Sequence, residues 1–430
     1  MAWDFSTEPE FQQKLDWIHG FMRAEVFPLE TLDLTQRELD RVTAPMKQEV
    51  KRQRLWAAHL DPELGGQGYG QVKLGLMHEL IGQSKLGPQV FGNQAPDSGN
   101  SEILAKHATP PQREKYLAPL LDGSKRSCFA MTEPGAGADP TLLETRAVRD
   151  GDVWVLNGDK WFATNASVAD FFIVMTVTNI EAAPHARASM FLIDAGTPGF
   201  DVVRDLGSME DPHPRPGGFD THSEVRLRDV RVPADNVLGE LGAGFAMAQE
   251  RLGPGRIHHC MRWIGQAKRA FDMLCERSLY RRAFGSLLCE KQTIQNWIAD
   301  SAADIHAARL MTLQAAWKME REGTRAARKE IAMIKYWGAR VLHDAIDRAL
   351  QIHGSLGYSS DLPLEEMYRR ARAARIYDGP DEVHRQTVAR LILREYSPPA
   401  DGIPTEHVPT RRERARRRFA ELLDRETANL

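Results

Sequence analysis

The hydrophobic period of this chain changes twice along its 430 residues. Apolar residues recur at helical spacing over 11–30 and 72–86. From about residue 127, runs of β-branched and aromatic residues replace that pattern, at 153–156, 160–164, 171–177, 190–193 and 225–232. Helical spacing returns after Gly239 in long segments at 243–280, 289–321, 326–352 and 380–394. The sequence therefore predicts an α+β multidomain chain in the order helical, β, helical.

Four parts follow from this order, because 430 residues are too many for one ordinary core. We expect an N-terminal helical domain, a central β-barrel domain, a C-terminal four-helix bundle and a Pro-containing linker with a basic C-terminal extension, over 1–126, 127–240, 241–396 and 397–430. Asn157-Gly158 lies between two apolar runs and predicts a β-hairpin, since both residues tolerate positive φ. Gly65 to Gly70 predicts a loop between two helices.

Composition narrows the class of protein. The chain is 42% apolar and 27% charged, as in soluble globular proteins, and its net charge of -3 gives no general case for nucleic-acid or membrane binding. It has no run of 18 apolar residues, which predicts no membrane span, and its acidic beginning does not resemble a signal peptide. The four cysteines lack CxxC spacing and indicate reduced thiols, with no metal site, in a cytoplasmic protein.

Two segments near the C-terminal end carry a family likeness. Gln351-Ile352-His353-Gly354 is followed by Ile376-Tyr377-Asp378-Gly379-Pro380, and this pair resembles segments of the acyl-CoA dehydrogenase family. Family members carry Gln-Ile-x-Gly and then Tyr-Glu-Gly, which holds the catalytic carboxylate; here Asp378 replaces the Glu. Residues 378–384 and 94–100 look most like a branch that is sometimes fused to a kinase-like domain. The resemblance spans roughly residues 10–396 and implies the acyl-CoA dehydrogenase fold.

The resemblance implies a catalytic base. Asp378 would remove the α-proton of an acyl-CoA thioester, which requires a carboxylate with a raised pKa in a dry pocket. Arg256 would position the acyl-CoA and the base, and Glu382 is a second candidate for the base. His258 and His259 are neighbours on a helix, cannot share one face, and are expected to line the pocket or pack.

Two further segments resemble the family's flavin-binding elements. Residues 131–139 match the flavin loop nearly residue for residue, so Met131, Thr132, Gly137 and Ala138 would contact FAD, with Thr132 bonding the flavin ring. Glycines in such a loop let the backbone come close to the cofactor. Phe162 and Thr164 resemble the family's ring-covering aromatic residue and the Thr beside flavin N5. The candidate residues on this side of FAD are Met131, Thr132, Gly137, Ala138, Phe162 and Thr164.

A second set of residues resembles the part of the family's FAD site that lies across a subunit interface. Its members are Arg281, Phe284, Gln292, Gln351 and Gly354, with Pro380 and Glu382 completing the cofactor candidates. An Arg suits the FAD diphosphate because a fixed cation pairs well with it. A site divided in this way implies a homo-oligomer, either a dimer or a tetramer built as a dimer of dimers.

The function that the resemblance implies is FAD-dependent dehydrogenation of an acyl-CoA to the trans-2-enoyl-CoA in fatty acid β-oxidation, with electrons passed to electron-transfer flavoprotein. Two alternatives remain: a flavin oxidase of the same fold, like nitroalkane oxidase, which also uses an Asp base, and a DNA-binding flavoprotein. The basic run at 411–418 suggests the latter and the net charge opposes it. The polar residues Gln94, Asp97, Ser98 and Asn100 are expected to line the acyl pocket, which would suit a substituted or hydroxylated chain.

Overall fold

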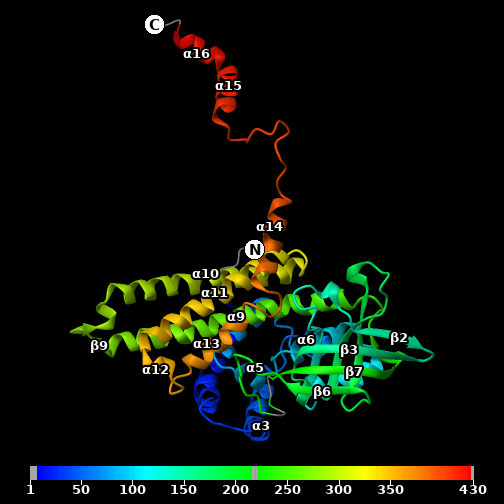
Figure 1. Ribbon diagram of the computed structural model, residues 1–430. Helices are drawn as coiled ribbons and strands as arrows, with labels where there is room; N and C mark the ends of the chain where they lie inside the picture. Colours follow the sequence, from blue (N-terminus) through cyan, green and yellow to red (C-terminus); the bar gives the residue numbers. More distant parts are fainter. Residues whose placement is uncertain (1–6, 216–217, 219–220, 428–430) are drawn as a thin grey trace. The chain divides into compact units, whose positions relative to one another are not determined.

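The computed structural model describes residues 7–215, 218 and 221–427, with the side chains of 424–427 left out of the description. The chain divides into two compact units, residues 1–385 and 386–430. Figure 1 shows the first unit as a group of long helices beside a sheet. Because residues 1–385 form one unit, the boundaries expected within it stay predictions.

The N-terminal region is helical, as its apolar spacing predicts. α1 packs on α4, and a capping box between Thr35 and Glu38 fixes the start of α3. Its elements are α1 Pro9–Phe21, η1 Met22–Val26, α2 Phe27–Leu29, α3 Gln36–Arg52, η2 Pro62–Leu64, α4 Gly70–Ile81, α5 Gly87–Val90, α6 Asp97–His107, α7 Pro110–Gln112, η3 Arg113–Leu117 and α8 Ala118–Asp122. The predicted loop before α4 is confirmed.

The central region is an eight-stranded sheet in the order β6-β7-β3-β2-β4-β5-β8, with β1 paired to β4. Its strands are β1 Ser127–Ala130, β2 Arg146–Asp150, β3 Val153–Thr164, β4 Phe171–Val177, β5 Ala188–Asp194, β6 Phe200–Asp205, β7 His222–Pro233 and β8 Val237–Leu238. Among the described strands the pairings form an open path from β6 to β8. The β region is confirmed, and it is an open sheet where we expected a barrel.

The hairpin predicted at Asn157-Gly158 is wrong. Both residues lie inside the continuous strand β3, where the register against β7 shifts between Leu156 and Gly158. The Asn157 side chain bonds Asp229 across the two strands and so holds this irregularity. The actual turn lies at Gly151, which has φ 59 and joins β2 to β3. The Asn-Gly pair between two apolar runs therefore lies at a β-bulge. A bulge, like a hairpin turn, favours residues that tolerate unusual φ.

Three long helices of the C-terminal region, α9, α10 and α11, pack on one another around a shared core. The fourth helix packed against α9 and α10 is α4, from the N-terminal region. The sequence pattern did not predict this packing, because α4 lies far from α9 and α10 along the chain. The elements are α9 Gly244–Tyr280, β9 Arg282–Ala283, β10 Ser286–Leu287, η8 Leu288–Glu290, α10 Gln292–Glu322, α11 Arg328–His353, α12 Ser355–Tyr358, α13 Leu364–Ala373 and α14 Asp381–Leu393.

In the second unit, α15 Val408–Arg418 and α16 Ala420–Thr427 follow a segment of turns and irregular structure. α15 contains the basic run 411–418 of the C-terminal extension. Over the described part of the chain, every helix is too short or too polar to span a membrane.

Candidate active site

Asp378 lies in the loop between α13 and α14, with its backbone at φ 54. A left-handed conformation is uncommon for a residue other than glycine and persists only where neighbouring contacts impose it. Two such contacts hold the Asp378 carbonyl: Arg256 Nε donates to it at 2.9 Å, and His384 Nε2 lies 3.1 Å from it. The Asp378 side chain is 20% exposed.

Lys335 of α11 holds the same loop from inside the protein. Its side chain is fully buried, and its Nζ donates to the carbonyls of Ala374 at 2.7 Å and Gly379 at 3.2 Å. The ammonium also lies over the rings of Trp263 and Tyr377. The loop is thus fixed by cations on both sides of Asp378, which sets the direction of its carboxylate.

The carboxylate of Asp378 faces α9. His259 Nε2 lies 3.4 Å from Asp378 Oδ2. Burial acts to raise the pKa of the Asp378 carboxyl, but His259 and the cations Arg256, Arg251 and Lys335 outweigh it and hold that pKa below its ordinary value. The raised pKa expected from the sequence is therefore wrong for this structure, because four basic groups surround the acid. Burial lowers the pKa of His259 to about 4, so its imidazole is neutral at pH 7.

The flavin-like loop 131–138 is fixed by a buried ion pair. Lys160 of β3 is fully buried, and its Nζ donates to Glu133 Oε1 at 2.8 Å and to the Met131 carbonyl at 3.0 Å. Glu133 also accepts the N–H groups of Glu144 and Thr145. This pair was missed in the sequence; a lysine inside an apolar strand, at position 160, was the available signal.

The loop and β3 meet directly, since Trp161 N donates to the Thr132 carbonyl at 2.8 Å. Beside this bond, Phe162 has φ 52 and a side chain 46% exposed, and Thr164 Oγ1 lies 3.0 Å from His222 Nδ1. The space next to Gly135 and Gly137 is open, with no atom within 4 Å of a Cβ placed there. An exposed aromatic face, hydroxyls and an open glycine backbone fit a flavin ring.

Residue contacts connect this surface to the Asp378 loop within one chain. His222 Nε2 lies 3.4 Å from Glu210 Oε2, and the Glu210 carboxylate is among the groups that act on the pKa of Tyr377, next to Asp378. Burial is the largest cause that raises the pKa of Tyr377 well above its ordinary value, and Glu210 raises it further. Arg369 of α13 also donates to the Glu210 carbonyl. A chain of interactions through His222 and Glu210 therefore runs from Thr164 to the residue next to Asp378.

The other cofactor candidates lie elsewhere. Arg256 lies within α9, and Arg281 follows 25 positions later at the C-terminal end of the helix. At the helical rise of 1.5 Å per residue, the two residues are about 37 Å apart along the helix axis. Phe284, in the β9–β10 turn, is 100% exposed with φ 50. Figure 1 shows β9 at the tip of the helices, on the opposite side from β2 and β3. The exposed residues of this second set are Arg281, Phe284, Gln292, Gln351 and Gly354.

Two candidates sit at the start of α14. Pro380 immediately precedes the helix, and Glu382 is exposed in its first turn. The cations Arg256, Arg251 and Lys335 act on the Asp378 carboxyl. Of the two proposed bases, Asp378 is thus the one that the cations surround.

Comparison with known proteins assigns three parts of the chain to one family. Family models for the N-terminal, middle and C-terminal domains of acyl-CoA dehydrogenases match residues 8–124, 128–214 and 242–393. Probable acyl-CoA dehydrogenase FadE2 of Mycobacterium tuberculosis is 44% identical over 354 residues, covering 81% of this chain and 84% of that protein. Acyl-CoA dehydrogenase family member 10 of Mus musculus is 40% identical over 405 residues, covering 90% of this chain and 37% of that longer protein.

A solved structure from Mycobacterium abscessus, assigned to the acyl-CoA dehydrogenases, is 37% identical with a TM-score of 0.84, covering 91% of this chain and 100% of that one. Fold and site together define an oxidoreductase that acts on acyl-CoA and has FAD as its family cofactor. The chain belongs to the acyl-CoA dehydrogenase family.

Proposed function

We propose that this protein removes one hydrogen from each of Cα and Cβ of an acyl-CoA to give the trans-2-enoyl-CoA, with Asp378 as the base. The observation that carries the proposal is the fixed loop of Asp378, whose carbonyl bonds Arg256 and His384 while Lys335 bonds the carbonyl of Gly379. A base held in one geometry can take the α-proton without first being ordered.

The backbone of the loop supports the same step. Within the described residues, the Asp378 N–H makes no main-chain hydrogen bond outside helices and strands. It is therefore free to donate to the thioester oxygen, where negative charge develops as the α-proton leaves. The carboxylate and the N–H donor belong to the same residue, so the geometry of one loop determines the positions of both groups.

Substrate binding would also strengthen the base. The Asp378 side chain is 20% exposed in the free protein, and an acyl chain packed over it removes this remaining water. Loss of water disfavours the charged carboxylate and raises its pKa, in opposition to the cations around it.

FAD, when bound, supplies the acceptor for the hydride that leaves Cβ. Thr132, Phe162 and Thr164 would hold its ring, while Arg281 and Phe284 of a second copy would reach its other end. The 25-residue separation along α9 between Arg256, which bonds the Asp378 carbonyl, and Arg281 supports this division. We infer a dimer or a dimer of dimers, electron-transfer flavoprotein as the electron acceptor, a cytoplasmic location and a role in fatty acid β-oxidation.

One observation favours the oxidase alternative. The cations around Asp378 hold its pKa below the ordinary value, which makes it a weak base. A weak base suits a carbon acid that loses its proton more readily than a thioester does. Turnover of a nitroalkane in air with peroxide formation would establish this function in place of the dehydrogenase.

Steady-state turnover tests the proposal. The FAD-loaded protein is mixed with straight- and branched-chain acyl-CoAs and an artificial electron acceptor, and the product is examined by mass spectrometry. The proposal predicts a thioester product lighter by two hydrogen atoms and no rapid peroxide formation in air. Peroxide formed from a nitroalkane, with every thioester unchanged, would contradict it.

A further inference from the structure

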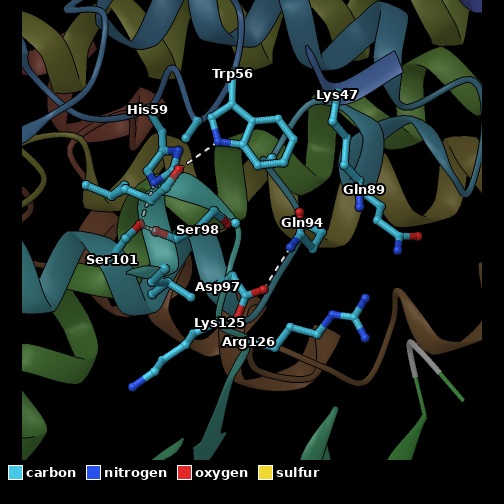
Figure 2. A pocket seen from close by; sticks show the side chains of 15 residues that line it. Lys47, Trp56, His59, Gln89, Gln94, Asp97, Ser98, Ser101, Lys125 and Arg126 are labelled. Carbon is cyan, nitrogen blue, oxygen red and sulfur yellow. Dashed lines mark hydrogen bonds between the residues drawn. The ribbon is translucent and has the colours of Figure 1, made fainter. Parts of the chain in front are cut away.

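A polar cavity lies in the N-terminal helical region, between α3, α5, α6 and the segment before β1. Its volume, counted as the space open to the centre of a water-sized sphere, is about 40 Å³. Figure 2 shows Lys47, Trp56, Gln89, Gln94, Asp97 and Arg126 among its lining side chains. Trp56 forms one wall and is held in place by its Nε1, which donates to the Leu121 carbonyl at 2.7 Å.

The lining of the cavity is positively charged. Three cations, Lys47, Lys125 and Arg126, and one carboxylate, Asp97, line it. Asp97 is already bonded to Ser127 and Gln94, Arg126 is paired with Asp40, and Lys125 donates to the Lys115 carbonyl. Within the described residues, the Lys47 ammonium makes no hydrogen bond or ion pair, although burial lowers its pKa. A partly buried ammonium without a partner is costly, and a bound anion would compensate for it.

An unpaired amide points to the same kind of ligand. Gln89 is 4% exposed, and its Nε2 has no hydrogen-bond acceptor within the described part of the chain. A buried N–H group without an acceptor costs about 1–3 kcal/mol. A ligand oxygen in this cavity would provide the acceptor, whereas a methyl group would leave the cost in place.

Buried contacts connect the cavity to Asp378. Asp97 Oδ1 accepts from Ser127 Oγ at 2.6 Å, and Asn100 Nδ2 donates to the same Ser127 Oγ at 2.8 Å. Arg251 Nε then donates to Asn100 Oδ1 at 3.1 Å, and Arg251 is one of the cations that act on Asp378. Asp97 and Asn100 are one turn apart on α6, about 4.5 Å along the helix axis.

We propose that this cavity receives the far end of the acyl chain and selects acyl-CoAs whose chain ends in an acidic group, with Lys47 as the residue that recognises the acid. The inference rests on the proposed function and adds the substrate class to it. The distal acid takes no part in the chemistry, so the hydrogens still leave Cα and Cβ, and the acid supplies binding energy alone.

Matched pairs of thioesters test this proposal. Binding of hexanoyl-CoA against adipoyl-CoA, and of octanoyl-CoA against suberoyl-CoA, is measured by calorimetry on the Asp378→Asn protein, which should bind without turnover. In at least one pair, the acid-ended member should bind more tightly. Lys47→Met in this background should weaken that member about 10- to 100-fold and leave its partner unchanged, as loss of a charged hydrogen bond does.

Lys14→Met is the control, because Lys14 donates to the Gln53 carbonyl and is not among the residues that line the cavity. Equal binding within all pairs, or equal losses in the Lys47 and Lys14 variants, would overturn the proposal. Free adipate that binds without competing with adipoyl-CoA would overturn it too, by showing a separate anion site. Flavin reduction by hexanoyl-CoA in the unmodified protein tests the dehydrogenase function separately.

Discussion

His259 Nε2 lies 3.4 Å from Asp378 Oδ2, and Arg256, one helical turn earlier on α9, donates to the Asp378 carbonyl at 2.9 Å. Residues three apart share one face of a helix, so α9 presents both groups to the same loop. His258 faces elsewhere, with its ring stacked on His78 and its Nε2 3.1 Å from Gln71 Oε1. The prediction that the two histidines take different faces is thus confirmed.

Asp378→Asn should abolish dehydrogenation and leave FAD bound. The amide keeps the shape of the carboxylate and cannot accept the α-proton, so the rate should fall roughly 10²- to 10⁴-fold, as for loss of a general base. Rapid-reaction absorbance measures the rate and the spectrum of the purified protein measures FAD content. Glu382→Gln is the control and should retain activity; if it alone were inactive, Glu382 would be the base.

His259→Leu should slow flavin reduction about tenfold, because the carboxylate loses the neighbour that restrains it. His259→Asn should recover part of that rate, since its amide can donate to the carboxylate. Loss of a group that favours the ionised acid should also move the acidic limb of kcat/KM to higher pH. An unchanged pH profile in the Leu variant would show that His259 only packs.

Lys160→Met should destabilise the protein by about 3–5 kcal/mol and lower its affinity for FAD, because Glu133 would stay buried without its cation. Lys115→Met is the control: Lys115 forms an exposed pair with Asp194 at 2.6 Å, and such a pair contributes less than about 1 kcal/mol. Denaturant unfolding and FAD titration measure the two effects. Equal losses in the two variants would contradict the role given to the buried pair.

Stability should fall as pH drops from 6.5 to 4. Burial lowers the pKa of His59, His259 and His384 from 6.5 to about 4. Between pH 6.5 and 4, these histidines bind protons in the unfolded chain but not in the folded protein. Each histidine therefore lowers the free energy of unfolding by up to about 1.4 kcal/mol for each pH unit of acidification. Denaturant midpoints against pH measure the slope. His59→Gln should make it shallower, and a flat profile would mean that these histidines are protonated when folded.

Phe284→Ser should weaken FAD binding about tenfold without changing the melting temperature of the protein stripped of FAD. The ring is 100% exposed, so within its own chain it adds little to the fold. Ile180→Ser, at an exposed apolar position of the β4–β5 connection, is the control and should leave FAD affinity unchanged. Sedimentation measures the assembly. Wild-type FAD affinity in the Phe284 variant would contradict a site shared between subunits.

The sequence predicted features that depend on local pattern. Apolar spacing placed α1, α4 and the long helices, and β-branched runs placed β4 at Phe171–Val177, because each signal lies within one element. Asn157-Gly158 misled us because its tolerance for unusual φ serves a bulge as well as a turn. The actual turn carries a similar signal at Asp150-Gly151.

Features that depend on contacts between distant segments could not be read in this way. Nothing in the residues around Lys335 indicates that its ammonium bonds the carbonyls of Ala374 and Gly379. The lowered pKa of Asp378 has the same origin, since Arg251, Arg256 and Lys335 come from two other helices. The family resemblance identifies Asp378 as the candidate base, whereas only the packing of the helices shows which groups surround its carboxylate.

Anaerobic titration of the FAD-loaded protein with single acyl-CoAs tests most directly whether Asp378 is the base of an acyl-CoA dehydrogenase. At least one thioester should bleach the visible flavin band in the unmodified protein, and the same thioester should leave Asp378→Asn yellow. Bleaching in both proteins would remove Asp378 as the base. A flavin that no thioester bleaches, in a protein that still binds FAD, would contradict acyl-CoA dehydrogenation itself.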